Sequence, residues 1–240
     1  MDSDGQRLLA TMPLHAITST YGEPGLRERF ALEIAPLPDA DRGRLERALD
    51  LASRLHAADR RDREPYVNHL LRVAIRIMSH YGVRDPDVVA AALLHDAVED
   101  HPLELSGGVD ASQQAALDAL AADFGPRVAE LVAAVTNPPW VPDRDEHEQY
   151  REHVAASLQR NPWARVIKAS DFTDNGVGLI HTTGPRLRKL AGKYAPLVPI
   201  LRELIVRPDT PLDPAAKEHI LGQLDRAEDR FAAVLLPGDG

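Results

Sequence analysis

The side chains best suited to chemistry in this sequence lie in one short segment, His95-Asp96 followed by Glu99 and Asp100. A run of alanines and leucines precedes them and predicts a buried helix. Burying an imidazole and three carboxylates is costly unless something compensates, and a divalent cation does so directly. On a continuous helix, His95 and Glu99 share one face, as do Asp96 and Asp100. We therefore expect His95 and Asp96 to ligate a metal, and Glu99 and Asp100 to line the pocket beside it.

Two more residues extend this candidate metal site. An isolated His-Asp pair is more often the solvated end of a helix. Here, however, His69 lies upstream on the buried face of another predicted helix, and Asp171 lies downstream after an apolar run. Two imidazoles and two carboxylates suit Mn²⁺, Fe²⁺ or Mg²⁺ with positions left open for water and substrate. Such a metal activates water and neutralises phosphoryl oxygens in phosphate ester hydrolysis.

The elements that must position these residues are helices, because helix formers dominate and β-branched runs are few. We predict an all-α protein with a core domain over 41–206. Residues 1–40 are rich in proline and glycine, which indicates an irregular N-terminal arm with one short helix over 25–34. Residues 207–240 form a linker and an amphipathic helix, whose apolar stripe serves either the core or a dimer contact. The helices expected in the core domain cover 41–55, 65–78, 85–100, 111–123, 126–135, 145–160, 163–173, 185–194 and 196–206.

Composition and charge limit the class of protein. The 240 residues are 44% hydrophobic and contain no cysteine, which excludes disulfides and thiolate metal sites. There is no apolar run of eighteen residues and no signal pattern at the start, so we expect a soluble, cytoplasmic protein without a membrane partner. The net charge of −9 argues against a nucleic-acid polymer as partner. The sequence leaves a homo-oligomer open.

Two basic clusters stand out in this acidic chain, one around Arg60 and Arg61 and one over 185–189. Each is either a solvated loop or a contact for a small phosphorylated ligand. An arginine plane is also suited to stacking on a nucleobase.

The order of the metal-binding residues, His then His-Asp then Asp, resembles the HD superfamily of metal-dependent phosphohydrolases. Other segments are similar to the hydrolase domain of the RelA/SpoT homologues, in particular the small alarmone hydrolases, and the resemblance spans about 45–205. The segments that carry it are Pro65-Tyr66-Val67-Asn68-His69, Ala91-Ala92-Leu93-Leu94-His95-Asp96, Val98-Glu99-Asp100, Phe124-Gly125, Val135-Thr136, Lys168-Ala169-Ser170-Asp171 with Asn175, and Tyr194-Ala195-Pro196-Leu197.

This resemblance implies an HD-domain helical bundle with bound Mn²⁺. It also implies removal of the 3′-pyrophosphate from (p)ppGpp, the alarmone of the stringent response, to give GDP or GTP and pyrophosphate. Carried over by position, the metal ligands are His69, His95, Asp96 and Asp171. The acids that orient or activate the attacking water and handle protons are Glu99 and Asp100. The substrate contacts are Arg60, Arg61, Asn175 and Tyr194.

The segment after Asp171 departs from the family pattern. Phe172 stands where the family usually has a basic residue, and 176–178 replaces a stretch that usually carries Arg or Thr. This altered segment keeps two other hypotheses open. One is an HD phosphatase for another nucleotide, for example NADPH. The other is a catalytically inactive HD protein that senses a nucleotide.

Overall fold

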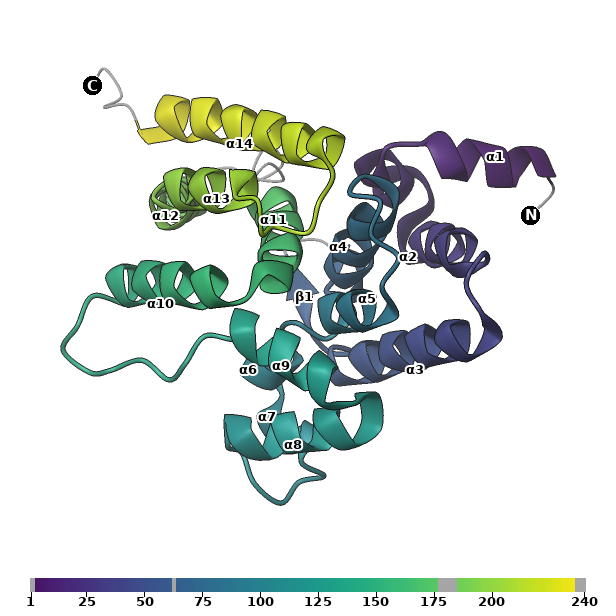
Figure 1. Ribbon diagram of the computed structural model, residues 1–240, viewed down its shortest axis with the longest axis horizontal. Coiled ribbons are helices and arrows are strands. Elements are labelled where there is room, and N and C mark those ends of the chain that lie inside the picture. Colours follow the sequence, from purple (N-terminus) through teal and green to yellow (C-terminus); the bar gives the residue numbers. More distant parts are fainter. Residues whose placement is uncertain (1–2, 62–63, 177–184, 236–240) are drawn as a thin grey trace. The chain divides into compact units, whose positions relative to one another are not determined.

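The computed structural model describes residues 3–61, 64–176 and 185–235. Helices form most of this described part, and its strands are the short antiparallel pair β1 (Arg60–Arg61) and β2 (Glu64–Pro65). The all-α class predicted from the sequence is therefore confirmed. The chain divides into two compact units, Met1–Thr136 and Asn137–Gly240, called here the N-terminal unit and the C-terminal unit (Figure 1). The subdivision predicted at residues 40 and 206 stays a prediction.

The N-terminal unit is built around the two helices α4 and α5. Helix α4 packs against α2 and α5, and α5 also packs against α3 and α9. Helices α8 and α9 lie against each other. The helices of this unit are α1 (Ser3–Thr11), α2 (Leu14–Ile34), α3 (Asp39–Leu55), α4 (Val67–Ser79), α5 (Pro86–Leu93), α6 (Ala97–Asp100), α7 (Pro102–Leu105), α8 (Gln113–Phe124) and α9 (Pro126–Val135).

Helix α4 is buried around its whole circumference, from Val67 to Met78. A helix in such surroundings must satisfy every polar side chain that it carries. Asn68 donates a hydrogen bond to Glu64 at 3.0 Å. Arg72 binds both carboxylate oxygens of Glu64, at 2.7 and 2.9 Å. These contacts join α4 to the hairpin that precedes it and leave His69 facing the interior.

Carboxylates anchor the start of α5, where the sequence predicts a helix start. Asp85 caps the helix by accepting a hydrogen bond from the backbone N–H of Asp87 at 3.0 Å, and Pro86 takes the first position. Arg127 of α9 binds Asp85 at 2.7 Å and Asp87 at 3.1 Å. Burial alone would raise the pKa of Asp85, but the hydrogen bond from Arg127 holds it below its usual value. The ion pairs join α5 to α9.

The sequence predicts one continuous helix over 85–100, and this prediction is wrong. Helix α5 ends before Leu94, whose φ of −107° and ψ of 7° lie outside the helical region. The N–H of Ala97 then bonds to the carbonyl of Leu94 at 3.0 Å and closes a turn. His95 and Asp96 therefore lie in a turn between α5 and α6, and the helical-face pairing predicted for His95 is lost. No Gly or Pro in the apolar run marks this break.

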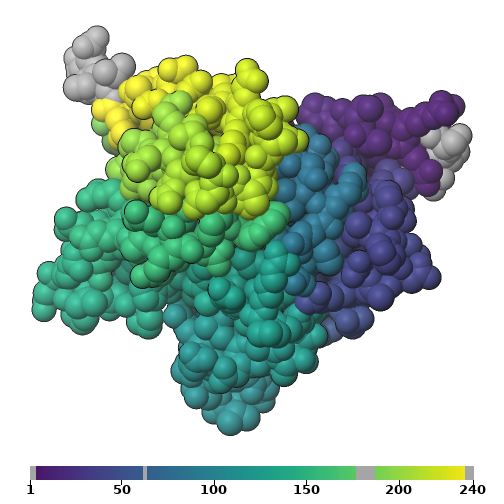
Figure 2. Space-filling view, viewed as in Figure 1, coloured from purple at the N-terminus to yellow at the C-terminus, as the bar shows by residue number. Residues whose placement is uncertain are grey.

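The irregular arm predicted over 1–40 is also wrong, because helices α1 and α2 occupy it. Gly22 kinks α2 with φ 62° and ψ −150°. After the kink, Leu26, Phe30 and Ile34 recur every four residues on one buried face, so the short helix expected over 25–34 is the second half of α2. Figure 2 shows the purple N-terminal residues lying directly against the blue residues of the same unit.

The C-terminal unit follows the helices predicted for it. Its last helix buries Ile220, Leu224 and Phe231 and packs against α11, α12 and α13, so the apolar stripe at the end of the chain serves this unit's own core. Among the described residues, no helix has the length and apolar character needed to span a membrane. The helices of this unit are α10 (Glu146–Arg160), α11 (Pro162–Gly176), α12 (Pro185–Tyr194), α13 (Leu197–Val206) and α14 (Pro214–Leu235).

A fully buried cation anchors α11, the helix that carries Asp171. Arg165 donates to both carboxylate oxygens of Asp209, at 2.8 and 3.0 Å, and to the hydroxyl of Thr210 at 2.7 Å. It also donates to the carbonyl of Leu158 at 2.7 Å. A buried guanidinium is stable only with such a complete set of acceptors. The hydrogen bond from Arg165 holds the pKa of Asp209 well below its usual range.

The packing of the N-terminal helices is testable by truncating Phe30, which is 1% exposed. We expect Phe30→Ala to lower the free energy of unfolding by about 3–5 kcal/mol, because it leaves a cavity in a packed core. Urea denaturation followed by circular dichroism measures this. Leu8→Ala, at a side chain that is 53% exposed, is the matched control and should have little effect. Equal effects of the two variants would contradict the packing described here.

Candidate active site

Three side chains of the N-terminal unit converge at the predicted metal site. His69 comes from α4, and His95 and Asp96 come from the turn before α6. Nε2 of His95 lies 3.0 Å from Oδ2 of Asp96 and 3.4 Å from Nε2 of His69. Nε2 of His69 lies 3.7 Å from the same Oδ2. Donor atoms that share an ion at about 2.1 Å lie roughly 3–3.5 Å from one another. The spacing therefore fits one divalent cation.

The hydrogen bonding of His95 also fits a metal ligand. Its Nδ1 lies 2.8 Å from the carbonyl oxygen of Ala92, so Nδ1 carries the proton and donates it. In the neutral ring, Nε2 is then a bare lone pair, as in most metal-bound histidines. This lone pair faces the Asp96 carboxylate at 3.0 Å, and the two repel unless a cation lies between them. The donor set therefore favours a proton or a metal cation between these atoms.

Tyr66, just before α4, holds Asp96 in place. Its hydroxyl donates to Oδ2 of Asp96 at 2.7 Å, and its ring packs edge-on to His69 with centroids 5.8 Å apart. Burial and the Asp96 carboxylate raise the pKa of Tyr66, so the phenol stays a neutral donor. The sequence analysis assigns this residue no role. Its position three residues before His69, one helical turn away, is the signal from which a role was predictable.

The predicted catalytic acids Glu99 and Asp100 form the last turn of α6 and keep contact with solvent. Burial of the Asp100 carboxyl group is the main cause that raises its pKa, and the nearby carboxylates of Asp96 and Glu99 raise it further, to about 6. A carboxyl group with a pKa near neutrality suits proton transfer at physiological pH. The structure places this pair next to Asp96 along the chain. Its catalytic role stays a prediction.

An open pocket of about 450 Å³ lies at Asp100, within the range of small-molecule sites. It brings together two of the predicted site residues, Arg60 and Asp100. Arg61 instead lies over the ring of Tyr66, with its guanidinium carbon 5.1 Å from the ring centroid. The residues that line the pocket are Ala58, Asp59, Arg60, Tyr66, Asp100 and His101.

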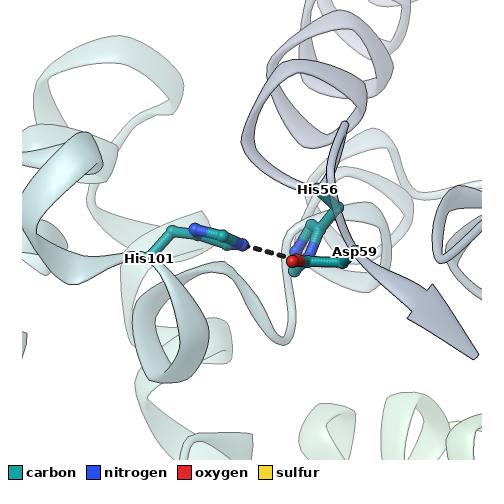
Figure 3. A group of neighbouring side chains, drawn as sticks. All are labelled: His56, Asp59 and His101. Atoms are coloured by element: carbon teal, nitrogen blue, oxygen red, sulfur yellow. Dashed lines mark hydrogen bonds and ion pairs between the residues drawn. The ribbon is translucent and has the colours of Figure 1, made fainter.

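A second group of side chains, not predicted from the sequence, consists of His56, Asp59 and His101 (Figure 3), of which Asp59 and His101 line this pocket. Nδ1 of His56 and Nε2 of His101 each lie 2.7 Å from Oδ2 of Asp59. His56 directly follows α3, and His101 links α6 to α7. The spacing of His56 and Asp59 was visible in the sequence, but nothing local indicated that a histidine 42 residues further on would join them.

In the C-terminal unit, Asp171 has a partner at each carboxylate oxygen. Lys168 lies 2.8 Å from Oδ2, and Asn175 donates to Oδ1 at 2.6 Å. Burial alone would lower the pKa of Lys168, but the Asp171 carboxylate raises it well above its usual value. The predicted residues Asp171 and Asn175 are thus brought together on α11. Asp171 as a metal ligand and Asn175 as a substrate contact stay predictions.

Tyr194, at the end of α12, is 8% exposed. Its ring lies edge-on to Phe172 of α11, with centroids 6.1 Å apart. Phe172 also lies edge-on to Phe231 of α14. The departure from the family pattern at Phe172 therefore has a packing role in this unit. Tyr194 as a substrate contact stays a prediction.

The chain is similar to known proteins over a large part of its length. An HD domain model matches residues 48–160. Guanosine-3′,5′-bis(diphosphate) 3′-pyrophosphohydrolase MESH1 of Homo sapiens is 34% identical over 136 residues, which are 55% of this chain and 67% of that protein. The guanosine-3′,5′-bis(diphosphate) 3′-pyrophosphohydrolase of Aquifex aeolicus is 30% identical over 185 residues, 75% of this chain and 24% of that protein.

Among solved structures, the chain is similar to a metazoan orthologue of SpoT that hydrolyses ppGpp and plays a role in starvation responses. The TM-score is 0.58 at 27% sequence identity, over 76% of this chain and 94% of that one. The sequence match to MESH1 and the match to this solved structure indicate the same family.

The role of Tyr66 in positioning a ligand is testable with Tyr66→Phe. We expect the affinity for Mn²⁺ to fall by about 10-fold or more, because Asp96 loses the hydrogen bond that orients it. The ring, and its packing on His69, are retained. Isothermal titration calorimetry on chelator-treated protein measures the affinity. Tyr21→Phe, at an exposed tyrosine of the same unit, is the control, and an unchanged affinity in Tyr66→Phe would refute the assignment.

Proposed function

The chain belongs to the HD domain family and, within it, to the family of the MESH1 and SpoT pyrophosphohydrolases, and from this premise we propose that it is a metal-dependent (p)ppGpp 3′-pyrophosphohydrolase. The products are GDP or GTP and pyrophosphate. The observation that carries the proposal is the convergence of His69, His95 and Asp96 on one point, with Asp100 of the pocket-lining turn nearby in the chain.

The metal is proposed to be held by His69, His95 and Asp96, with Asp171 as the fourth ligand. Two imidazoles with carboxylates favour a borderline to hard divalent ion, and we propose Mn²⁺, with Fe²⁺ or Mg²⁺ as substitutes. When bound, this ion lowers the pKa of a coordinated water and neutralises charge on the phosphoryl oxygens. Tyr66 keeps the Asp96 carboxylate turned towards the two imidazoles.

Proton transfer is proposed to depend on Asp100. Its raised pKa lets it be ionised at neutral pH and still accept the proton of the attacking water. Glu99, on the same turn, contributes to that raised pKa through its own carboxylate and orients the water. Arg60 supplies positive charge on the pocket wall for the nucleotide phosphates. Asn175 and Tyr194 are proposed as further substrate contacts.

The test is a substrate panel on chelator-treated protein supplied with MnCl₂. ppGpp, pppGpp, NADPH and GTP are incubated separately, and the products are resolved by ion exchange. Pyrophosphate with GDP from ppGpp, abolished by chelator and by Asp96→Asn, supports the proposal. Orthophosphate from NADPH would move the substrate to another nucleotide. No turnover of any substrate, with Mn²⁺ shown to be bound, would refute an enzyme of this class.

The fall of kcat/KM on the acid side of the pH profile should reflect protonation of Asp100. A general base must be ionised, so kcat/KM is expected to fall as the pH drops through the Asp100 pKa of about 6 and to approach a tenfold loss per pH unit below it. Asp100→Asn should lower kcat by about 10²–10⁴-fold and remove this acid-side fall. Asp50→Asn, at an exposed acid on α3, is the control. Saturating Mn²⁺ at every pH separates this effect from loss of metal, and an acid-side fall retained in Asp100→Asn would exclude the role.

Arg60 should contribute directly to substrate binding, because it lines the pocket, whereas the guanidinium of Arg61 lies over the ring of Tyr66. Arg60→Ala is expected to raise the KM for ppGpp by about tenfold with a smaller change in kcat, because it removes a charged contact on the pocket wall. Initial rates over a range of ppGpp concentrations give both constants. Arg54→Ala, at an exposed arginine of α3, is the matched control. An unchanged KM in Arg60→Ala would remove Arg60 from the substrate site.

A further inference from the structure

The group formed by His56, Asp59 and His101 has the chemistry of a metal site that is separate from the first. One ligand atom from each residue lies within 4.8 Å of the other two, and Figure 3 shows both imidazole rings directed at the same carboxylate. Each ring is hydrogen-bonded to that carboxylate at 2.7 Å, so an ion that binds here takes the place of these two hydrogen bonds. Two imidazole nitrogens and one carboxylate oxygen are a common ligand set for a three-residue Zn²⁺ site, which leaves a fourth position open.

The rings are held in orientations suited to this role. His56 stacks on Tyr66 with centroids 4.6 Å apart and an interplanar angle of 10°, and it meets the edge of His101 at 4.6 Å. On the far side of the His101 ring, Nδ1 lies 3.8 Å from the carboxylate of Glu104.

Exposure is graded across the group. The side chain of His56 is 1% exposed, that of His101 15%, and that of Asp59 35%. Asp59 and His101 line the pocket. The open coordination positions of an ion held here therefore face the pocket.

The charge of the surroundings favours a cation. The acidic residues Asp96, Glu99 and Asp100 lie in or directly before the short helix α6, and Asp59 and Asp100 line the pocket. Arg60 is the cationic residue among the described residues that line the pocket. A nucleotide that carries several phosphates meets this same negative field on entry. A divalent ion between the carboxylates and a phosphate reverses the local sign of the potential.

From these observations we infer that His56, Asp59 and His101 bind a second divalent cation of the Zn²⁺ type. This cation coordinates a phosphate oxygen of the substrate bound in the pocket. The metal-binding half of this inference stands without the proposed function, whereas the phosphate-binding half rests on it. Tyr66 lies between the two metal sites, because its ring stacks on His56 and its hydroxyl binds Asp96.

The first test counts tight Zn²⁺ sites in the chelator-treated full-length chain, by competition with a chelating indicator. The wild-type chain is expected to bind two equivalents. Asp59→Asn and His101→Gln should each bind one, and so should the double variant His69→Gln/His95→Gln, which removes the first site. His147→Gln, at an exposed histidine of α10, should keep two. Circular dichroism checks that every variant retains its helices.

One tight equivalent in the wild type, or two in both Asp59→Asn and His101→Gln, would overturn the inference. If Asp59→Asn fails to fold, His101→Gln gives the same count from a residue on a different segment of the chain, between α6 and α7. Two equivalents together with no turnover of ppGpp would refute the proposed function and leave the second site standing. The stoichiometry therefore separates the two failures.

The second test measures binding of inorganic pyrophosphate to the Zn²⁺-loaded double variant His69→Gln/His95→Gln by calorimetry. We expect binding that weakens at least about tenfold when His101→Gln is added or Zn²⁺ is removed. Equal affinity with and without Zn²⁺ would overturn the phosphate-binding half. Control titrations of pyrophosphate into Zn²⁺ without protein correct for direct complex formation.

Discussion

The structure depends on one electrostatic constraint, the approach of a bare imidazole nitrogen to a carboxylate oxygen in a buried place. The carbonyl of Ala92 fixes the proton of His95 on Nδ1, which turns the lone pair of Nε2 towards Asp96 at 3.0 Å. His69 approaches from a third direction and is 0% exposed. Such an arrangement is unfavourable by itself and becomes favourable around a divalent ion. The fold must therefore hold these atoms against their own repulsion.

The helices around the site differ in how strongly they constrain the residues that they carry. Helix α4 is enclosed on all sides, and the ion pairs of Arg127 with Asp85 hold α5 against α9. His69 thus stands on a fully enclosed helix, and His95 and Asp96 lie in the turn that directly follows α5. Glu99 and Asp100 stand instead on the short helix α6, in contact with solvent. This division suits a site in which ligands need fixed positions while acids must exchange protons with water.

The sequence was a good guide where function follows from local spacing. The resemblance marks His69, His95 and Asp96, and the structure brings them together, because each lies in a short motif with its own supporting residues. The break at Leu94 was not predictable, since alanine and leucine favour a continued helix and tertiary contacts end it. Helix α1 and the first half of α2 were not predicted, because Pro13, Gly22 and Pro24 favour irregular structure in a sequence. The partnership of Asp59 with His101 joins residues that only the folded chain brings together.

Tyr66 gives the site a connection that neither metal-binding group has alone. A single side chain stacks on His56, donates to Asp96 and carries the guanidinium of Arg61 over its ring. Because the raised pKa keeps the phenol protonated, its hydrogen bond to Asp96 persists across the range of pH in which histidines titrate. A displacement of His56 moves the ring on which it stacks, and the ring carries the hydroxyl that orients Asp96. The two groups therefore share one rigid aromatic side chain, which contacts a residue of each.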